Sequence, residues 1–146
     1  MEIRIRRVRR TDYAALAALC GWPPLDSNPA RSLRLFRKVA ADLACDLYVA
    51  EEGERPVGVV AVSYVRALSL GGQRATLEEL VVHPERRLGG VGRRLLEFVV
   101  RRAERRGARA FEARPADEAA ERFLDRLGFR PRGRRYACPI GEEPSS

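Results

Sequence analysis

The chain has 146 residues, a length that suits one domain with a substantial core, and its apolar content of 45% is ordinary for a globular protein. No apolar run approaches the ~18 residues of a membrane-spanning helix, so a membrane partner is not expected. The net charge is +8, but the arginines are scattered and lack interleaved stacking aromatic residues, which disfavours a nucleic-acid partner.

The first half of the chain is predicted to contain four strands and two helices. Asn28-Pro29 is typical of a helix start, with asparagine at the N-cap and proline at the first helical position. The nearly unbroken apolar run over 57–65 indicates a strand covered on both faces, and Gly71-Gly72 indicates the hairpin turn that follows it. The expected helices cover 13–20 and 29–43, and the expected strands cover 3–8, 47–50, 57–65 and 75–82.

The second half is predicted to contain two helices and at least two strands. We expect a helix over 91–106, a strand over 110–113 and a helix that follows the N-cap residue Asp117. The segment 129–140 is predicted to form one bent strand or a final pair of strands. No linker divides the chain, so we expect one domain over 1–141 and a flexible polar tail over 142–146.

The three cysteines, Cys20, Cys45 and Cys138, are odd in number and widely spaced. This pattern argues against a disulfide framework and against a zinc site. We therefore expect a reducing, cytoplasmic environment and no bound metal.

A glycine-rich junction between a strand and a helix is the most informative stretch. The apolar strand ends at His83-Pro84, because proline cannot donate a hydrogen bond to the sheet. A basic turn with Gly89, Gly90 and Gly92 follows, and then a helix. Glycines allow backbone N–H groups to point outward at the positive end of that helix, which predicts an anion site suited to phosphate. The motif G-x-G-x-x-G and the P-loop motif are both absent.

The turn matches the pattern R/Q-x-x-G-x-G/A as Arg87-Leu88-Gly89-Gly90-Val91-Gly92. With the preceding strand and the following helix, it resembles the acetyl-coenzyme A (acetyl-CoA) motif of the GNAT N-acetyltransferase family. Residues 114–129 resemble the closing motif of the same family. The resemblance implies an α/β (α+β) fold: one domain with a mixed, mostly antiparallel sheet of six to seven strands, splayed at the central strands and flanked by about four helices. We expect a monomer or homodimer.

The resemblance implies transfer of an acetyl group from acetyl-CoA to an amine within a ternary complex, without a covalent intermediate. The pyrophosphate would lie on the N–H groups of residues 88–92, and the pantetheine would pair with the strand backbone. An alternative is a degenerate member that binds acyl-CoA as a sensor or accessory subunit. The residues expected to bind acetyl-CoA are Leu80, Val81, Val82, Arg87, Leu88, Gly89, Gly90, Val91, Gly92 and Arg93.

Two adjacent glutamates in the central strand are the candidate proton acceptors. Glu78 and Glu79 are expected on opposite faces, so that one points into the cleft. The resemblance favours Glu79 as the catalytic base and leaves Glu78 for the substrate. Either could instead pair with an arginine. His83, the only histidine, is expected to have a structural role, and a backbone N–H near Val81 is expected to meet the oxyanion.

The general acid and the acceptor remain open. Leu124 occupies the position where many family members carry a tyrosine thought to protonate the leaving thiolate. Either no acid is present, or Tyr136 supplies it. Trp22 and Tyr64 are candidate substrate-binding residues. A small amine, an amino acid and a protein amine are all possible acceptors, and the basic surface slightly favours an acidic one.

Overall fold

The computed structural model describes residues 2–22 and 28–141. The chain forms two compact units, residues 1–114 and 115–146, and each is described by itself. The predicted tail over 142–146 lies outside the described residues. The elements of the first unit are β1 (Ile3–Arg7), η1 (Arg10–Asp12), α1 (Tyr13–Cys20), α2 (Pro29–Ala41), β2 (Cys45–Glu52), β3 (Arg55–Ala67), η2 (Leu68–Leu70), β4 (Gly72–Val82), η3 (Pro84–Arg86), α3 (Val91–Arg105) and β5 (Ala108–Ala113).

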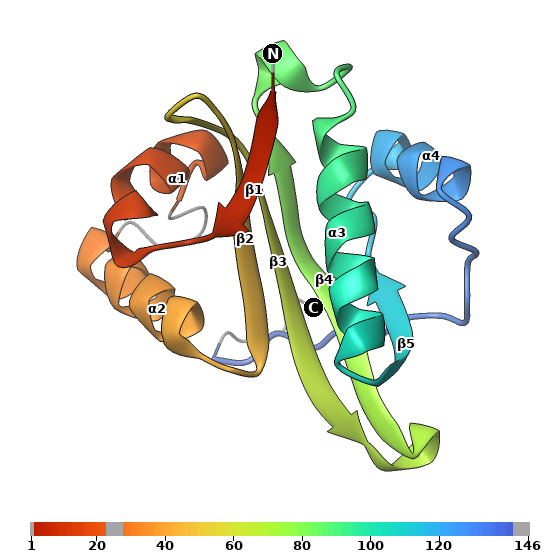
Figure 1. Cartoon of the computed structure of the whole chain (residues 1–146). Helices are drawn as coiled ribbons and strands as arrows, with labels where there is room; N and C mark the ends of the chain where they lie inside the picture. Colours follow the sequence, from red (N-terminus) through yellow and green to blue (C-terminus); the bar gives the residue numbers. More distant parts are fainter. Residues whose placement is uncertain (1, 23–27, 142–146) are drawn as a thin grey trace. The chain divides into compact units, whose positions relative to one another are not determined.

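In the described part of the chain, a single sheet contains five strands in the order β1-β2-β3-β4-β5 (Figure 1). The first four strands are antiparallel, and β5 runs parallel to β4. The mixed, mostly antiparallel sheet is therefore confirmed, but the expected number of six to seven strands is wrong. Residues 129–141 contain no strand. Pro131 and Pro139 lack an N–H donor for a sheet ladder, and Gly133 has a φ of 66°, outside the extended region.

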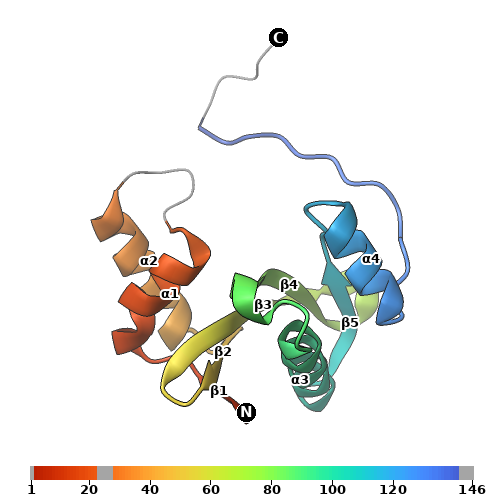
Figure 2. The ribbon, with the colours of Figure 1, turned by 90° about the horizontal axis from the view of Figure 1, so that it is seen from above.

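Helices cover both faces of this sheet. Helices α1 and α2 lie over one face, and α3 lies over the other (Figure 2). Val59 of β3 packs with Leu16 and Phe36 on the first face, while the next residue, Val60, points the other way and is also buried. The prediction that this strand is covered on both faces is confirmed.

Helix α2 begins where the sequence predicts and ends earlier. The Asn28 side chain accepts a hydrogen bond from the Arg31 N–H at 3.2 Å, as an N-cap residue should. The helix stops at Ala41 because the Asp42 carboxylate accepts the Ala44 N–H at 2.8 Å, a local bond that competes with helix continuation. Leu43 therefore lies outside the helix and is exposed.

Gly58 of β3 lies where the first turn of α3 meets the sheet. A Cβ atom at Gly58 would lie 3.0 Å from Leu95 Cδ1 and 3.1 Å from Val91 Cγ1. Glycine therefore permits α3 to approach this part of the sheet closely. Since Gly58 is paired with Val82 in the β3–β4 register, the start of α3 is held beside the end of β4.

The second unit contains α4 (Glu118–Arg126). The Asp117 carboxylate accepts the Ala120 N–H at 2.8 Å and caps the helix, as predicted. Gly128, with a φ of 90°, follows the helix end.

Candidate active site

The predicted phosphate turn joins the end of β4 to the start of α3. The His83 N–H donates to the Val57 carbonyl at 2.8 Å, and η3 follows. Gly90 is the N-cap of α3 with a φ of 79°, a left-handed conformation that glycine adopts readily and β-branched residues rarely do. The Arg94 N–H donates to the Gly90 carbonyl at 3.0 Å. The N–H groups of residues 91–93 precede that bond, so they have no acceptor within the helix and lie at its positive end.

The residues predicted to bind acetyl-CoA come together in this region. Arg87 Nε donates to the Val82 carbonyl at 3.4 Å, which ties the turn to the strand. Leu88 is fully exposed at the tip of the turn, and Arg93 pairs with Glu97 along the exposed side of α3 at 2.8 Å. Outward N–H groups and a helix start suit a phosphate ligand, so these residues fit the group that the sequence predicts.

The backbone of β4 separates from β5 before it reaches the turn. The β4–β5 register runs from Gln73 opposite Ala108 to Leu77 opposite Ala113, where β5 ends. Among the described residues, the β5 side of residues 78–82 therefore has no strand partner. Backbone groups on this edge are available to a ligand that can form strand-like hydrogen bonds.

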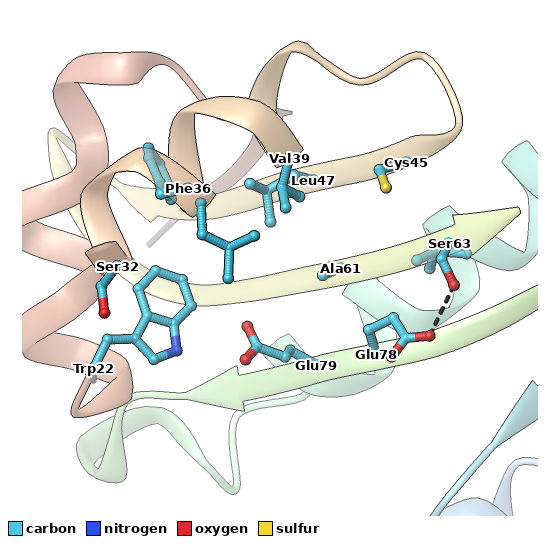
Figure 3. Close-up of a pocket in the computed structure, with 12 residues that line it drawn as sticks. Trp22, Ser32, Phe36, Val39, Cys45, Leu47, Ala61, Ser63, Glu78 and Glu79 are labelled. Carbon is cyan, nitrogen blue, oxygen red and sulfur yellow. Dashed lines mark hydrogen bonds between the residues drawn. The ribbon is translucent and has the colours of Figure 1, made fainter. Parts of the chain in front are cut away.

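A β-bulge brings both glutamates onto one face of β4. Ala61 of β3 is opposite Glu79 and Val62 is opposite Leu77, so Glu78 is an additional residue in β4. The extra residue interrupts the alternation of side chains. Glu78 and Glu79 consequently both line the same pocket (Figure 3), and the prediction that they lie on opposite faces is wrong.

The pocket lies on the face of the sheet that α1 and α2 cover. Its cavity has a volume of about 410 Å³. Figure 3 shows Glu79 pointing into the space below Phe36 and beside Trp22. The lining residues come from the segment after α1, from α2, and from strands β2, β3 and β4: Trp22, Ser32, Leu35, Phe36, Val39, Cys45, Leu47, Ala61, Val62, Ser63, Glu78 and Glu79.

The two carboxylates differ in their surroundings. Burial raises the pKa of Glu79, and the charge of Glu78 raises it further, while a hydrogen bond from the Trp22 side chain acts in the opposite direction. Glu78 is exposed, and its Oε1 accepts a hydrogen bond from the Ser63 hydroxyl at 2.8 Å (Figure 3). Within residues 2–22 and 28–141, neither carboxylate forms a salt bridge with an arginine.

Tyr64 lies away from this pocket, which corrects its assignment as a substrate-binding wall. Its hydroxyl donates to Asp46 at 2.6 Å, and the Arg106 guanidinium lies 3.8 Å from its ring centre. Arg102 donates to the same buried carboxylate at 3.2 Å. Because both arginines belong to α3, Tyr64 is part of the core on the opposite face of the sheet. Burial and the Asp46 carboxylate raise the pKa of Tyr64.

His83 also lies outside the pocket lining, and Tyr136 belongs to the second unit. His83 Nδ1 accepts the Glu85 N–H at 3.2 Å, and Nε2 lies 3.0 Å from an Arg55 nitrogen. These contacts engage both ring nitrogens and favour the structural role. Tyr136 is 87% exposed and belongs to the second unit, as does Leu124. Its role as a general acid therefore remains a prediction.

Several pocket residues were not identified from the sequence. Ser63 is the most informative of these, because a hydroxyl interrupts a strand that is otherwise apolar and points to a polar contact at that position. Ser32, Leu35 and Val39 lie on α2, where nothing in the spacing separates a pocket wall from ordinary core.

Two kinds of feature are absent from the described residues. No described helix has the length and apolar character needed to cross a bilayer. No group of three histidine, cysteine, aspartate or glutamate side chains in the described ranges could hold a metal ion. The three cysteines are free thiols.

Comparisons with known proteins agree with this geometry. The family model for the acetyltransferase (GNAT) family matches residues 13–129. The fold is similar to a transcriptional regulator from Bacillus halodurans C-125, with 25% identity over 95% of this chain and 100% of that chain and a TM-score of 0.85. It is also similar to an aminoglycoside 6′-N-acetyltransferase from Acinetobacter baumannii (19% identity, 96% and 100% of the two chains, TM-score 0.78). A predicted acetyltransferase from Clostridium acetobutylicum, whose structure includes acetyl-CoA, has 15% identity over 94% and 96% of the two chains and a TM-score of 0.80. No curated protein shows significant sequence similarity to the chain.

Proposed function

We propose that this chain, which belongs to the acetyltransferase (GNAT) family, transfers the acetyl group of acetyl-CoA to a primary amine by direct attack in a ternary complex. One observation carries the proposal. A half-buried carboxylate, Glu79, points into an acceptor-sized pocket from the strand whose unpaired edge leads to the phosphate turn. The expected base and the expected donor site therefore belong to one short piece of chain.

The donor is expected to bind along β4 and the start of α3. Of the N–H groups of residues 88–92, that of Gly89 donates to the Arg86 carbonyl at 3.1 Å, so the others would hold the pyrophosphate, with the positive end of α3 behind them. The backbone groups on the unpaired edge at residues 80–82 would form hydrogen bonds with the amide groups of the pantetheine, with carbonyls as acceptors and N–H groups as donors. The solved Clostridium acetobutylicum relative contains acetyl-CoA, which supports this choice of donor.

Glu79 would act as the base. Its carboxylate accepts a proton from the ammonium, directly or through one water, because an amine can attack only after it has lost that proton. The nitrogen then forms a bond to the acetyl carbon as the carbon–sulfur bond breaks, and the second proton that the nitrogen loses passes to water or to the departing thiolate. A β4 backbone N–H near Val81 is the candidate donor to the developing oxyanion. Burial raises the pKa of Glu79, which brings its basicity closer to that needed at neutral pH.

The sulfur can leave with little assistance. A thiol with a pKa near 8.5, by analogy with cysteine, departs reasonably well as a thiolate at neutral pH. We therefore propose that the enzyme works with Leu124 in place of a tyrosine, and that Tyr136 is the candidate donor if a proton is delivered. On the cysteine pattern, we place the reaction in the cytoplasm, with the protein as a monomer or homodimer.

A second function is favoured by one observation. Leu124 occupies the position of the expected acid, so the chain could bind acyl-CoA as a sensor without turnover. Thiol release from acetyl-CoA over a panel of amines separates the two, with binding of acetyl-CoA measured by calorimetry on the same sample. Amine-dependent thiol release supports the transferase. Binding with no release for any amine would favour the sensor.

A further inference from the structure

We infer that the acceptor is a small monoamine that carries an aromatic or branched apolar body and no carboxylate. The inference rests on the proposed function, because it names the amine that the acetyl group reaches. It comes from the walls, the charge and the hydrogen-bonding groups of the pocket beside Glu79.

The walls of the pocket are mainly apolar. The Trp22 and Phe36 rings lie 6.1 Å apart with 52° between their planes, and Tyr13 packs against Phe36 from behind at 5.3 Å. Leu35 lines the same pocket, although 61% of its surface is exposed. An exposed apolar side chain beside two rings gains from a ligand that removes it from water. The seven apolar lining residues are Trp22, Leu35, Phe36, Val39, Leu47, Ala61 and Val62.

The charge of the pocket is opposite to that of the chain. The protein carries 28 lysine and arginine residues and a net charge of +8, but among the described residues the lining contains no basic side chain and two carboxylates, Glu78 and Glu79. An ammonium is attracted to these carboxylates. A carboxylate on the acceptor would meet like charges and no cation. The expectation that the basic surface favours an acidic acceptor is therefore not supported at the pocket itself.

The pocket offers few hydrogen bonds away from the glutamates. Ser32 and Ser63 supply the hydroxyls, and Ser63 already donates to Glu78. An aminoglycoside would leave several hydroxyl and ammonium groups against apolar walls, where each loses its water without gaining a partner. A polyamine has only short methylene segments between its ammonium groups, so it covers less of the apolar wall than an aromatic or branched body does. Both are therefore disfavoured relative to one amine on an apolar body.

Matched pairs of acceptors test the inference. Tryptamine and tryptophan differ by one carboxylate, as do 2-phenylethylamine and phenylalanine. We expect kcat/KM to be at least 100-fold higher for each amine than for its amino acid, which corresponds to about 2.7 kcal/mol. Kanamycin, spermidine, ethanolamine and an alanyl peptide complete the panel, and each should be at least tenfold slower than tryptamine. The inference would be overturned if any of these four compounds had a higher kcat/KM than tryptamine, or if either amino acid had a higher kcat/KM than its matching amine.

A variant of the pocket rim gives a test that depends on location. Leu35→Arg places a cation at the pocket without filling the core, since Leu35 is largely exposed. We expect it to reduce the tryptamine-to-tryptophan ratio of kcat/KM by at least tenfold. Leu68→Arg is the matched control, because Leu68 is exposed at the β3–β4 connection and does not line the pocket. Equal ratios in both variants and the parent would show that this pocket does not select the acceptor.

A binding measurement distinguishes failure of the inference from failure of the proposed function. Calorimetry with coenzyme A present compares the dissociation constants of tryptamine and tryptophan without turnover. Preferential tryptamine binding with no thiol release for any amine would refute acetyl transfer and support the acceptor class. Thiol release with another class of acceptor would support transfer and refute the class. No binding preference and no release would refute both.

Discussion

Replacement of Glu79 by glutamine tests the proposed base directly. Glutamine keeps the shape of the side chain and can still accept the Trp22 hydrogen bond, but it cannot take a proton from the ammonium. General base catalysis contributes roughly 10²–10⁴-fold. Glu79 is only partly buried, so water can replace it to some extent, and we expect the lower end of that range. We therefore expect kcat to fall about 100-fold, equivalent to about 2.7 kcal/mol of transition-state stabilisation, with the affinity for acetyl-CoA nearly unchanged.

The dependence of the rate on pH adds a signature that a purely structural role would not produce. In the parent, kcat/KM for the amine should rise with pH through a carboxylate pKa above the ordinary glutamate value, since burial raises the pKa of Glu79. Glu78→Gln removes a charge that raises this pKa, so the rising part of the pH–rate profile (the carboxylate limb) should move to lower pH. Trp22→Phe removes a hydrogen bond that lowers it, so the limb should move to higher pH. The limb due to the amine itself should stay in place.

Thermal unfolding provides the control for folding. Because the folded-state pKa of Glu79 is raised, the folded protein holds this proton more tightly than the unfolded chain, and its stability decreases as pH rises between the two pKa values. At neutral pH the Glu79 carboxylate is therefore destabilising, and Glu79→Gln should unfold at the same or a higher temperature than the parent.

The assay is thiol release at saturating acetyl-CoA, with the amine varied at each pH. Glu78→Gln should keep kcat within about tenfold of the parent, because Glu78 is exposed and held by Ser63. If Glu78→Gln loses 100-fold and Glu79→Gln does not, the wrong carboxylate has been assigned. Identical pH limbs in all four proteins would refute the base mechanism.

Three further predictions concern the turn, the acid and the buried ion pairs. Gly90→Val should weaken acetyl-CoA binding at least tenfold by calorimetry, about 1.4 kcal/mol. The control is Gly107→Val, which has a similar φ of 81° at the other end of α3 and should leave the affinity unchanged. Equal losses of affinity in the two variants would refute the assignment of the phosphate turn. Tyr136→Phe should have the pH–rate profile of the parent, and a falling alkaline limb that is present in the parent and lost in the variant would instead identify Tyr136 as the acid. Asp46→Asn should lower the free energy of unfolding by about 2–4 kcal/mol in denaturant titration at pH 7, because it leaves Arg102 and Arg106 without their carboxylate. Despite its burial, the pKa of Asp46 is lowered by hydrogen bonds from Arg102 and Tyr64, so this stabilisation is present at neutral pH. The difference in unfolding free energy between parent and variant should shrink as pH falls below the ordinary value of 3.8. An undiminished difference at acid pH would contradict the ion-pair explanation.

The parts of the fold that the sequence predicts well depend on local chemistry. Asn28 and Asp117 cap their helices through hydrogen bonds to residues three positions later, and such contacts are encoded within a few residues. Gly90 likewise has the left-handed conformation that its turn requires. Helix starts and the glycine turn could therefore be located without knowledge of the sheet.

The parts that were missed depend on pairing between distant segments. The bulge at Glu78 arises from how β4 aligns with β3, and no pattern within β4 alone reveals it. The same dependence applies to Tyr64. The face of the sheet on which its side chain lies is set by its partners, Asp46 and Arg106, which come from β2 and α3. Segment 129–140 is predicted to form one bent strand or a pair of strands, but Pro131 and Pro139 lack the N–H donors that a sheet ladder needs.

The close contact at Gly58 has a consequence for the choice of acyl donor. It holds the start of α3 beside Val82, three residues beyond Glu79, which is roughly 10 Å along a strand. A donor that reacts next to Glu79 while its phosphate rests on the turn must bridge that length. In an acyl phosphate a single oxygen separates the acyl carbon from phosphorus, so such a molecule can occupy one end or the other but not both. Under the proposed function, this spacing favours donors with a long arm between the acyl group and the phosphate.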